Sequence, residues 1–288
     1  FDTGPLYGNG NSQKILGKIL KNKRNDNIIS TKAGLEKEIR PDGSFGVKVE
    51  KLTPIYLRKS LENSLKQINT DYIDLFQLHA FDESTPLEET IGEVDNLYNE
   101  GLIRAFGVSN YNPIQLKKIN ELLKGSNIKN LAAIESHYNL IERKIETGIM
   151  PECNKSGISI MPYRCLARGI LSGQYNLDGT IPVGSRAEDS WRVRDWLQPG
   201  TLKLVNQLEA LSNRNAISIA QLALSWLISK SSICSAIIGV KQNDQLDELV
   251  NATKFDLSNE LNLEIDQIIK DSGEYKNVIS RPEVYFEK

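Results

Sequence analysis

Short apolar runs alternate with amphipathic segments along the whole chain. Apolar and β-branched runs predict strands at residues 28–33, 73–79, 103–109, 132–138, 159–164 and 235–240. Apolar positions that recur every three to four residues predict helices over residues 54–68 and 86–100, with Gly101 ending the second. Pro113 opens a further helix, and Asn112 before it is suited to the N-cap.

This alternation predicts an α/β protein with a parallel sheet, either open and doubly wound or closed into a barrel. An open dinucleotide-binding sheet should carry G-x-G-x-x-G after a strand, but Gly8-Asn9-Gly10 lacks the third glycine. Six strands and a stub at residues 1–3 make seven, so an eighth strand before Phe1 would complete a (β/α)8 TIM barrel. We therefore expect a single barrel domain over residues 1–288, N-terminally incomplete. The long irregular segment 175–200 is interpreted as a loop or lid.

Composition and net charge argue against several classes of binding partner. The 288 residues are 40% hydrophobic and 25% charged, which is ordinary for a soluble globular protein. A net charge of −2 without a basic stretch argues against nucleic acid and anionic membranes. Three cysteines and two histidines form neither a disulfide framework nor a metal-ligand spacing, so we expect no metal and a cytoplasmic location. Neither a signal peptide nor an apolar run of membrane-spanning length is present in this sequence.

Polar residues stand where the predicted strands end. Asp2 and Tyr7 follow the first stub, Lys32 closes its strand and His79 ends the next one. In a parallel barrel these positions meet at the face that carries the chemistry. Together they could reduce a carbonyl: Tyr7 would donate the proton, a charged Lys32 would lower its pKa, Asp2 would hold Lys32 protonated, and His79 would donate to the carbonyl oxygen.

None of these four groups can supply a hydride, so a cofactor is required. Ser109 and Asn110 could hold a nicotinamide carboxamide, and Tyr163 could stack under the ring. The turn over residues 238–245 brings a glycine, Lys241 and a helix N-terminus together after the last strand, a common phosphate site in barrels. Read alone, Lys241 could equally be a solvated surface lysine.

The motifs in this order resemble those of the aldo-keto reductases over nearly the whole chain. They are FDTGPLYG (1–8), STK (30–32), DYIDLFQLH (71–79), GVSNY (107–111), and IG (238–239) followed by Gln245. The resemblance implies an NADPH-dependent barrel whose catalytic tetrad is Asp2, Tyr7, Lys32 and His79. The cofactor contacts that it implies are Ser109, Asn110, Glu135, Tyr163, Leu166, Arg186, Gly239, Lys241, Gln245 and Glu248, with Lys241 and Gln245 on the 2′-phosphate. Segments 84–90 and 143–147 are most similar to the aflatoxin-aldehyde and succinic-semialdehyde reductase branch, and the lid is similar to that of potassium channel β-subunits.

Three positions depart from the family pattern. Glu135 stands where the family usually has glutamine, Arg164-Cys165 replaces Ser-Pro, and Leu249 replaces an asparagine that meets the adenine. Glutamate can accept a hydrogen bond from a carboxamide NH₂ but cannot donate one to its oxygen. Arg164 could pair with Glu135 or a phosphate, or meet an acidic substrate.

The predicted function is NADPH-dependent reduction of a small aldehyde or ketone, with NAD less favoured and a homo-oligomer possible. One alternative is a redox-sensing, cofactor-binding regulatory subunit like the channel β-subunits, which commonly carry asparagine where this chain has His79. Another is a sugar or pyridoxal dehydrogenase that uses NAD(P) in the reverse direction. Substrate choice is assigned to the loops after the strands and to the tail 262–288, where Tyr275, Tyr285 and Phe286 could line a pocket or cover the barrel.

Overall fold

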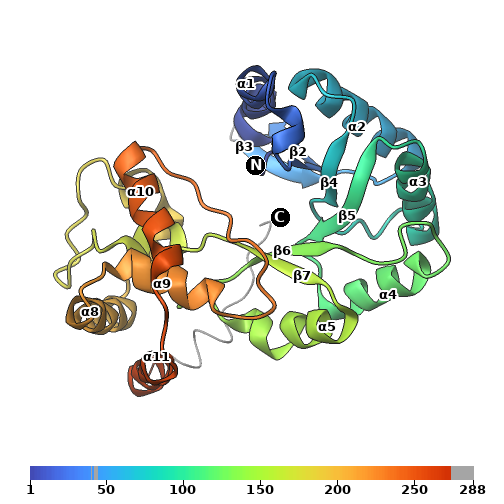
Figure 1. Ribbon diagram of the computed structural model, residues 1–288. Coiled ribbons are helices and arrows are strands. Elements are labelled where there is room, and N and C mark those ends of the chain that lie inside the picture. The colour runs from blue at the N-terminus through green and yellow to red at the C-terminus, as the bar shows by residue number, and fades with distance from the viewer. Residues whose placement is uncertain (40, 42–44, 274–288) are drawn as a thin grey trace. The chain divides into compact units, whose positions relative to one another are not determined.

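The computed structural model describes residues 1–39, 41 and 45–273, which form two compact units (Figure 1). The first unit comprises Phe1–Ser136 and Pro151–Ser159. The second comprises His137–Met150 and residues 160–273.

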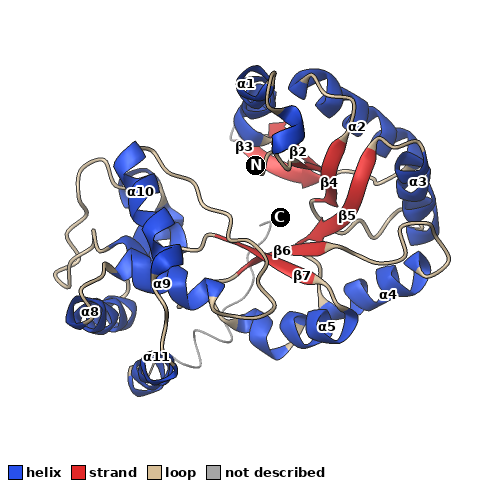
Figure 2. Ribbon diagram, in the orientation of Figure 1, coloured by secondary structure: helices blue, strands red, loops and turns tan. Residues whose placement is uncertain are grey.

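The first unit is built on a parallel sheet (Figure 2). Its strands are β1 (Ser30–Ala33), β4 (Ile73–Leu78), β5 (Ile103–Ser109) and β6 (Ala133–His137), in the order β1-β4-β5-β6. The stub at the start of the chain joins this sheet through a parallel bridge between Asp2 and Ser30. The next strand is β7 (Ser159–Tyr163), whose first amide donates to Ala132 O over 3.1 Å. The predicted parallel α/β arrangement and these strands are confirmed.

Helices connect the strands and bury one face each. They are α1 (Asn11–Leu20), α2 (Pro54–Ile68), α3 (Leu87–Asn99), α4 (Pro113–Leu123) and α5 (Ile149–Ser156). The α2 helix starts at the proline because Thr53 Oγ1 accepts from Tyr56 N, and its apolar side buries Leu57 and Leu61 completely. The α4 helix begins with the expected Asn112 cap, which forms a reciprocal pair with Gln115.

A hairpin that we did not predict follows β1. It consists of β2 (Leu35–Ile39) and β3 (Phe45–Val49), which are antiparallel with Leu35 opposite Val49. Two 3-10 turns, η1 (Tyr7–Gly10) and η2 (Arg24–Asp26), complete the first unit.

The second unit is mainly helical. Its helices are α6 (Arg186–Asp189), α7 (Trp191–Trp196), α8 (Pro199–Arg214), α9 (Ile219–Ile228), α10 (Asn243–Asn251) and α11 (Asn259–Asp271), with 3-10 turns η3 (Lys144–Thr147), η4 (Ala167–Ser172) and η5 (Ala252–Lys254). Segment 175–200, expected to be irregular, contains α6, α7 and the start of α8; helices this short show no apolar period. The predicted C-terminal tail, residues 262–288, begins inside α11. Its Tyr275, Tyr285 and Phe286 lie outside the described residues.

The prediction of a strand over residues 235–240 is wrong, because this segment does not form a regular strand. It runs beside β7: Ile160 N donates to Ser232 O, Cys234 N to Ile160 O, and Ile237 N to Pro162 O. Proline has no N–H, so Pro162 cannot donate the next bond of a parallel ladder. The register therefore slips by one residue at Ile237 and the ladder ends.

Among the described residues no helix has the length and apolar character needed to cross a bilayer. Nor do His, Cys, Asp and Glu residues of that part of the chain gather into a group that could hold a metal ion.

Candidate active site

Register brings the tetrad candidates of the first unit to the same edge of the sheet. Asp2 bridges to Ser30 at the start of β1, and Lys32 in β1 lies opposite Gln77 in β4, two residues before His79. In the same way Ser109 at the end of β5 lies opposite Glu135 in β6. The carboxyl ends of the parallel strands thus place Asp2, Lys32 and His79 together, as the sequence pattern indicated.

A buried charge cluster forms around Lys32. Its Nζ donates to Asp2 Oδ1 and Oδ2 over 2.5 and 2.6 Å, and it lies 3.1 Å from Glu135 Oε2. The Lys32 side chain is fully buried, and those of Asp2 and Glu135 are 11% and 4% exposed. Gln77 Nε2 donates to the same Glu135 Oε2 over 3.0 Å and to Ser30 Oγ over 2.8 Å. The structure therefore gives Glu135 a partner, Lys32, that our sequence interpretation did not consider.

Tyr7 and His79 lie next to this cluster. Tyr7 opens η1 after a turn in which its amide donates to Gly4 O over 3.0 Å. Lys32 Nζ lies 5.2 Å from the centre of the Tyr7 ring, and the His79 ring meets that ring edge-on with centroids 6.0 Å apart. An acid, an ammonium and an imidazole therefore surround one phenol.

Burial and charge set the protonation states of this site. Burial raises the pKa of Tyr7; Lys32 lowers it, but Glu135 and Asp2 raise it further, so that Tyr7 is a phenol at neutral pH. The sequence predicted that Lys32 would lower this pKa; burial has the larger effect, in the opposite direction. Burial lowers the pKa of Lys32, but Glu135 and Asp2 outweigh this effect and hold the pKa above its usual value. Burial, with help from the charge of Lys32, lowers the pKa of His79 to about 3, so its ring is neutral.

The two residues predicted to hold a carboxamide lie where β5 ends: Ser109 is its last residue and Asn110 follows it. Asn110 takes the left-handed conformation (φ 63°), which asparagine tolerates better than most residues. Its amide N donates to Glu135 O over 3.0 Å, and its Nδ2 donates to His79 O over 3.1 Å and to Ser109 Oγ over 3.0 Å. Asn110 therefore links the ends of β4, β5 and β6 and fixes the backbone beside His79.

The other cofactor candidates belong to the second unit. Tyr163 ends β7, and its ring stacks on His137 with centroids 5.5 Å apart, while the Arg164 guanidinium lies 5.3 Å from the ring centre. Leu166 follows as the N-cap of η4, and Arg186 is the first residue of α6.

The predicted phosphate turn does lead into a helix, α10. Gln245 Oε1 accepts from the amides of Lys241 and Gln242 over 2.9 and 3.2 Å, so the glutamine caps the helix with its own side chain. Glu248, on the next turn of α10, accepts a hydrogen bond from Ser218 Oγ over 2.5 Å, and Ser218 is the N-cap residue of α9. At Gly239 a Cβ would meet no heavy atom within 4 Å, so sterics do not require glycine there.

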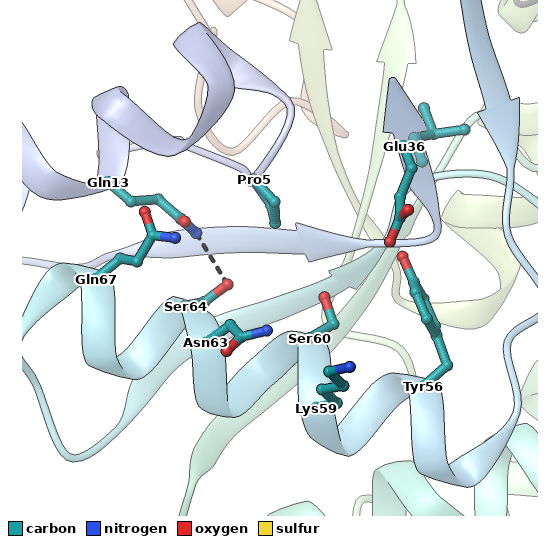
Figure 3. Close-up of a pocket in the computed structure, with 10 residues that line it drawn as sticks. Pro5, Gln13, Glu36, Tyr56, Lys59, Ser60, Asn63, Ser64 and Gln67 are labelled. Carbon is teal, nitrogen blue, oxygen red and sulfur yellow. Dashed lines mark hydrogen bonds between the residues drawn. The ribbon is translucent and has the colours of Figure 1, made fainter. Parts of the chain in front are cut away.

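A surface hollow of about 230 Å³ lies along α2 in the first unit (Figure 3). Its lining includes Pro5, Glu36, Tyr56 and Gln67, and the hydrogen bond from Gln13 Nε2 to Ser64 Oγ lies at one side of it. None of its lining residues belongs to the tetrad. The charge cluster, rather than this hollow, is the candidate site.

Sequence reasoning missed two residues beside the predicted ones. Gln77 lies two positions before His79, and the two-residue period of a strand could have placed both side chains on one face. His137, considered only as a metal ligand, lies between aromatic rings: Tyr163, and Trp196 of α7 with centroids 6.0 Å apart.

Comparisons with known proteins establish the family of the chain. The family model described as Aldo/keto reductase family matches residues 1–270. Aldo-keto reductase YhdN of Bacillus subtilis is 31% identical over 98% of this chain and 81% of its own length. The NADH-specific methylglyoxal reductase of Escherichia coli is 32% identical over 90% of this chain and 79% of its own. In structure, the glycerol dehydrogenase AKR11B4 from Gluconobacter oxydans matches with a TM-score of 0.82 and 28% identity, over 100% of this chain and 84% of that one.

The chain belongs to the aldo/keto reductase family. Its fold class is therefore the α/β (β/α)8 barrel class of that family, as the sequence resemblance implied. It is an oxidoreductase that acts on carbonyl or CH–OH groups and uses a nicotinamide cofactor. The roles of the individual site residues remain predictions.

Proposed function

We propose that the protein reduces a small aldehyde or ketone to its alcohol, with NADPH preferred over NADH and with Tyr7 as the proton donor. The observation that carries this proposal is the environment of one phenol. Lys32, itself 2.5 Å from Asp2, lies 5.2 Å from the Tyr7 ring centre, and His79 meets the same ring edge-on.

The residues at the strand ends fit a nicotinamide. When bound, this group supplies the hydride, which no side chain of the cluster can provide. The Ser109 hydroxyl and the Asn110 amide have the donor and acceptor chemistry to bind a carboxamide. Asn110 is already anchored to His79 O, so a carboxamide held there would lie beside the proton-transfer residues.

The chain's own residues then move one proton. The Tyr7 phenol gives its proton to the substrate oxygen while the carbonyl carbon accepts the hydride, so the carbonyl becomes an alcohol. The phenolate that remains is stabilised by the charge of Lys32 and is reprotonated from water. His79, neutral because burial lowers its pKa to about 3, orients the carbonyl oxygen through an N–H. The same steps in reverse oxidise an alcohol.

We place the contact that favours NADPH over NADH, the one to its 2′-phosphate, at the start of α10. The lysine there, Lys241, is exposed and precedes a helix of nine residues, whose N-terminus favours anions. We expect Lys241→Ala to weaken NADPH by about ten- to hundredfold, the effect of one charge-assisted contact, and NADH much less. Fluorescence titration of both cofactors measures this. Lys254→Ala, an exposed lysine beyond the other end of α10, is the matched control, and equal weakening of both cofactors by Lys241→Ala would refute the assignment.

The function itself is tested by titrating the protein with NADPH and then following NADPH oxidation with a panel of aldehydes and ketones. Turnover of at least one carbonyl is the expected result. Tight binding without turnover of any member, in either direction, would instead indicate a cofactor-binding regulatory subunit. We also propose a cytoplasmic location, which is supported by three cysteines that are all free thiols.

A further inference from the structure

The Lys32 ammonium has two carboxylate partners, one on each of two different elements. Asp2, beside β1, binds through both oxygens at 2.5 and 2.6 Å, and Glu135 of β6 approaches with Oε2 at 3.1 Å. Gln77 of β4 donates to that same Oε2 over 3.0 Å. Glu135 is thus held from two sides and is buried, with a side-chain exposure of only 4%.

The count of charges distinguishes this cluster from a simple ion pair. Asp2 and Lys32 alone would be neutral as a pair. With Glu135 ionised, one ammonium is shared by two carboxylates, and the cluster beside Tyr7 carries a net negative charge. A negative charge in a buried place opposes the formation of a phenolate nearby.

We propose that Glu135 is a positioning residue for proton transfer: as a second counter-ion it draws the charge of Lys32 away from Tyr7 and keeps Tyr7 in the proton-donating phenol form. This inference rests on the proposed role of Tyr7. It assigns Glu135 to Lys32 rather than to the cofactor carboxamide, and it explains why a carboxylate at this position is compatible with reduction. Its functional consequence is a reductase that stays active to higher pH.

The direction of the pKa shifts agrees with this geometry. After burial and the opposing effect of Lys32, Glu135 raises the pKa of Tyr7 more than Asp2 does. Burial also raises the pKa of Glu135 itself, against the effect of Lys32, but at the alkaline pH where a phenol titrates it is a carboxylate. The remaining titratable neighbour, His79, has a pKa of about 3 and stays neutral throughout that range.

The test is Glu135→Gln, which keeps the shape and an oxygen that can accept from Lys32 and Gln77 but removes the charge. Without this charge Tyr7 loses its proton at lower pH. The alkaline limb of kcat/KM for carbonyl reduction should therefore move to lower pH by roughly one unit, about tenfold in rate at a fixed pH on that limb. The rising limb of alcohol oxidation should move the same way, because both limbs report the same phenol.

Two further variants exclude a merely structural effect. Glu135→Asp retains the charge and should leave both limbs near their wild-type positions. Glu93→Gln removes another buried carboxylate of the same unit, one paired with Arg58 Nε at 2.8 Å, and should not move the limbs. If Glu135→Gln leaves the limbs in place but changes the ratio of NADPH to NADP⁺ affinities several-fold, Glu135 serves the cofactor and the proposal is wrong.

The proposal can fail independently of the proposed function. Ultraviolet difference titration of the tyrosinate, with Tyr7→Phe as the subtracted reference, follows the ionisation of Tyr7 without any substrate. If the wild-type protein reduces no carbonyl, the proposed function fails, and this titration still decides whether Glu135→Gln makes Tyr7 ionise at lower pH. An unchanged titration of Tyr7 overturns the role of Glu135 even if reduction is observed.

Discussion

Replacing Tyr7 by phenylalanine is expected to slow carbonyl reduction by about 10²–10⁴-fold while NADPH binding stays unchanged. The substitution removes the only hydroxyl proposed to donate to the substrate oxygen. It keeps the ring that lies 5.2 Å from Lys32 Nζ and edge-on to His79, so the packing of the site is preserved. Steady-state kcat for reduction and NADPH titration by fluorescence measure the two quantities separately.

Tyr56→Phe is the matched control for this prediction. Tyr56 is a partly buried tyrosine of the same unit whose hydroxyl accepts from Gly34 N over 3.2 Å, and it is not proposed to touch the substrate. It should reduce stability slightly and leave kcat near the wild-type value. If Tyr7→Phe keeps more than about a third of the wild-type kcat, Tyr7 is not the proton donor.

Much of this site could be predicted because it depends on local patterns. Strand ends follow from apolar runs bounded by polar residues, and in parallel sheets those ends share one edge, which brought Asp2, Lys32 and His79 together. The order of the motifs then indicated the family. None of this required knowledge of packing between distant segments.

The partners of individual side chains were less accessible from the sequence. The ion pair between Lys32 and Glu135 depends on the registers of β1, β4, β5 and β6 together, and no spacing along the chain encodes it. For the same reason the effect of burial on Tyr7, which outweighs Lys32, was not foreseen. The wrong strand prediction at residues 235–240, by contrast, could have been avoided from the sequence. Pro162 lies in the neighbouring strand, and its missing N–H predicts that the ladder of hydrogen bonds is interrupted there.

Lys32 should also be the residue on which the stability of this site depends most. We expect Lys32→Met to lower the free energy of unfolding by about 3–5 kcal/mol at neutral pH, because it strands the carboxylates of Asp2 and Glu135 without their counter-ion. Methionine fills a similar volume, so the loss reflects charge rather than a cavity. Denaturant or thermal unfolding followed by circular dichroism measures it.

The pH dependence of this loss separates charge from packing. Without Lys32, Glu135 loses the cation that opposes the effect of burial, so its pKa in the folded state rises further above its value in the unfolded chain. Carboxyls of this kind destabilise the fold at high pH, and the penalty disappears as the pH falls below their folded-state pKa values. The deficit of Lys32→Met relative to wild type should therefore shrink towards pH 4. The triple variant Asp2→Asn, Lys32→Met, Glu135→Gln strands no charge and should recover most of the stability at neutral pH. A deficit that is the same at pH 4 and pH 8, and that the triple variant does not relieve, would show that the cluster contributes through packing alone.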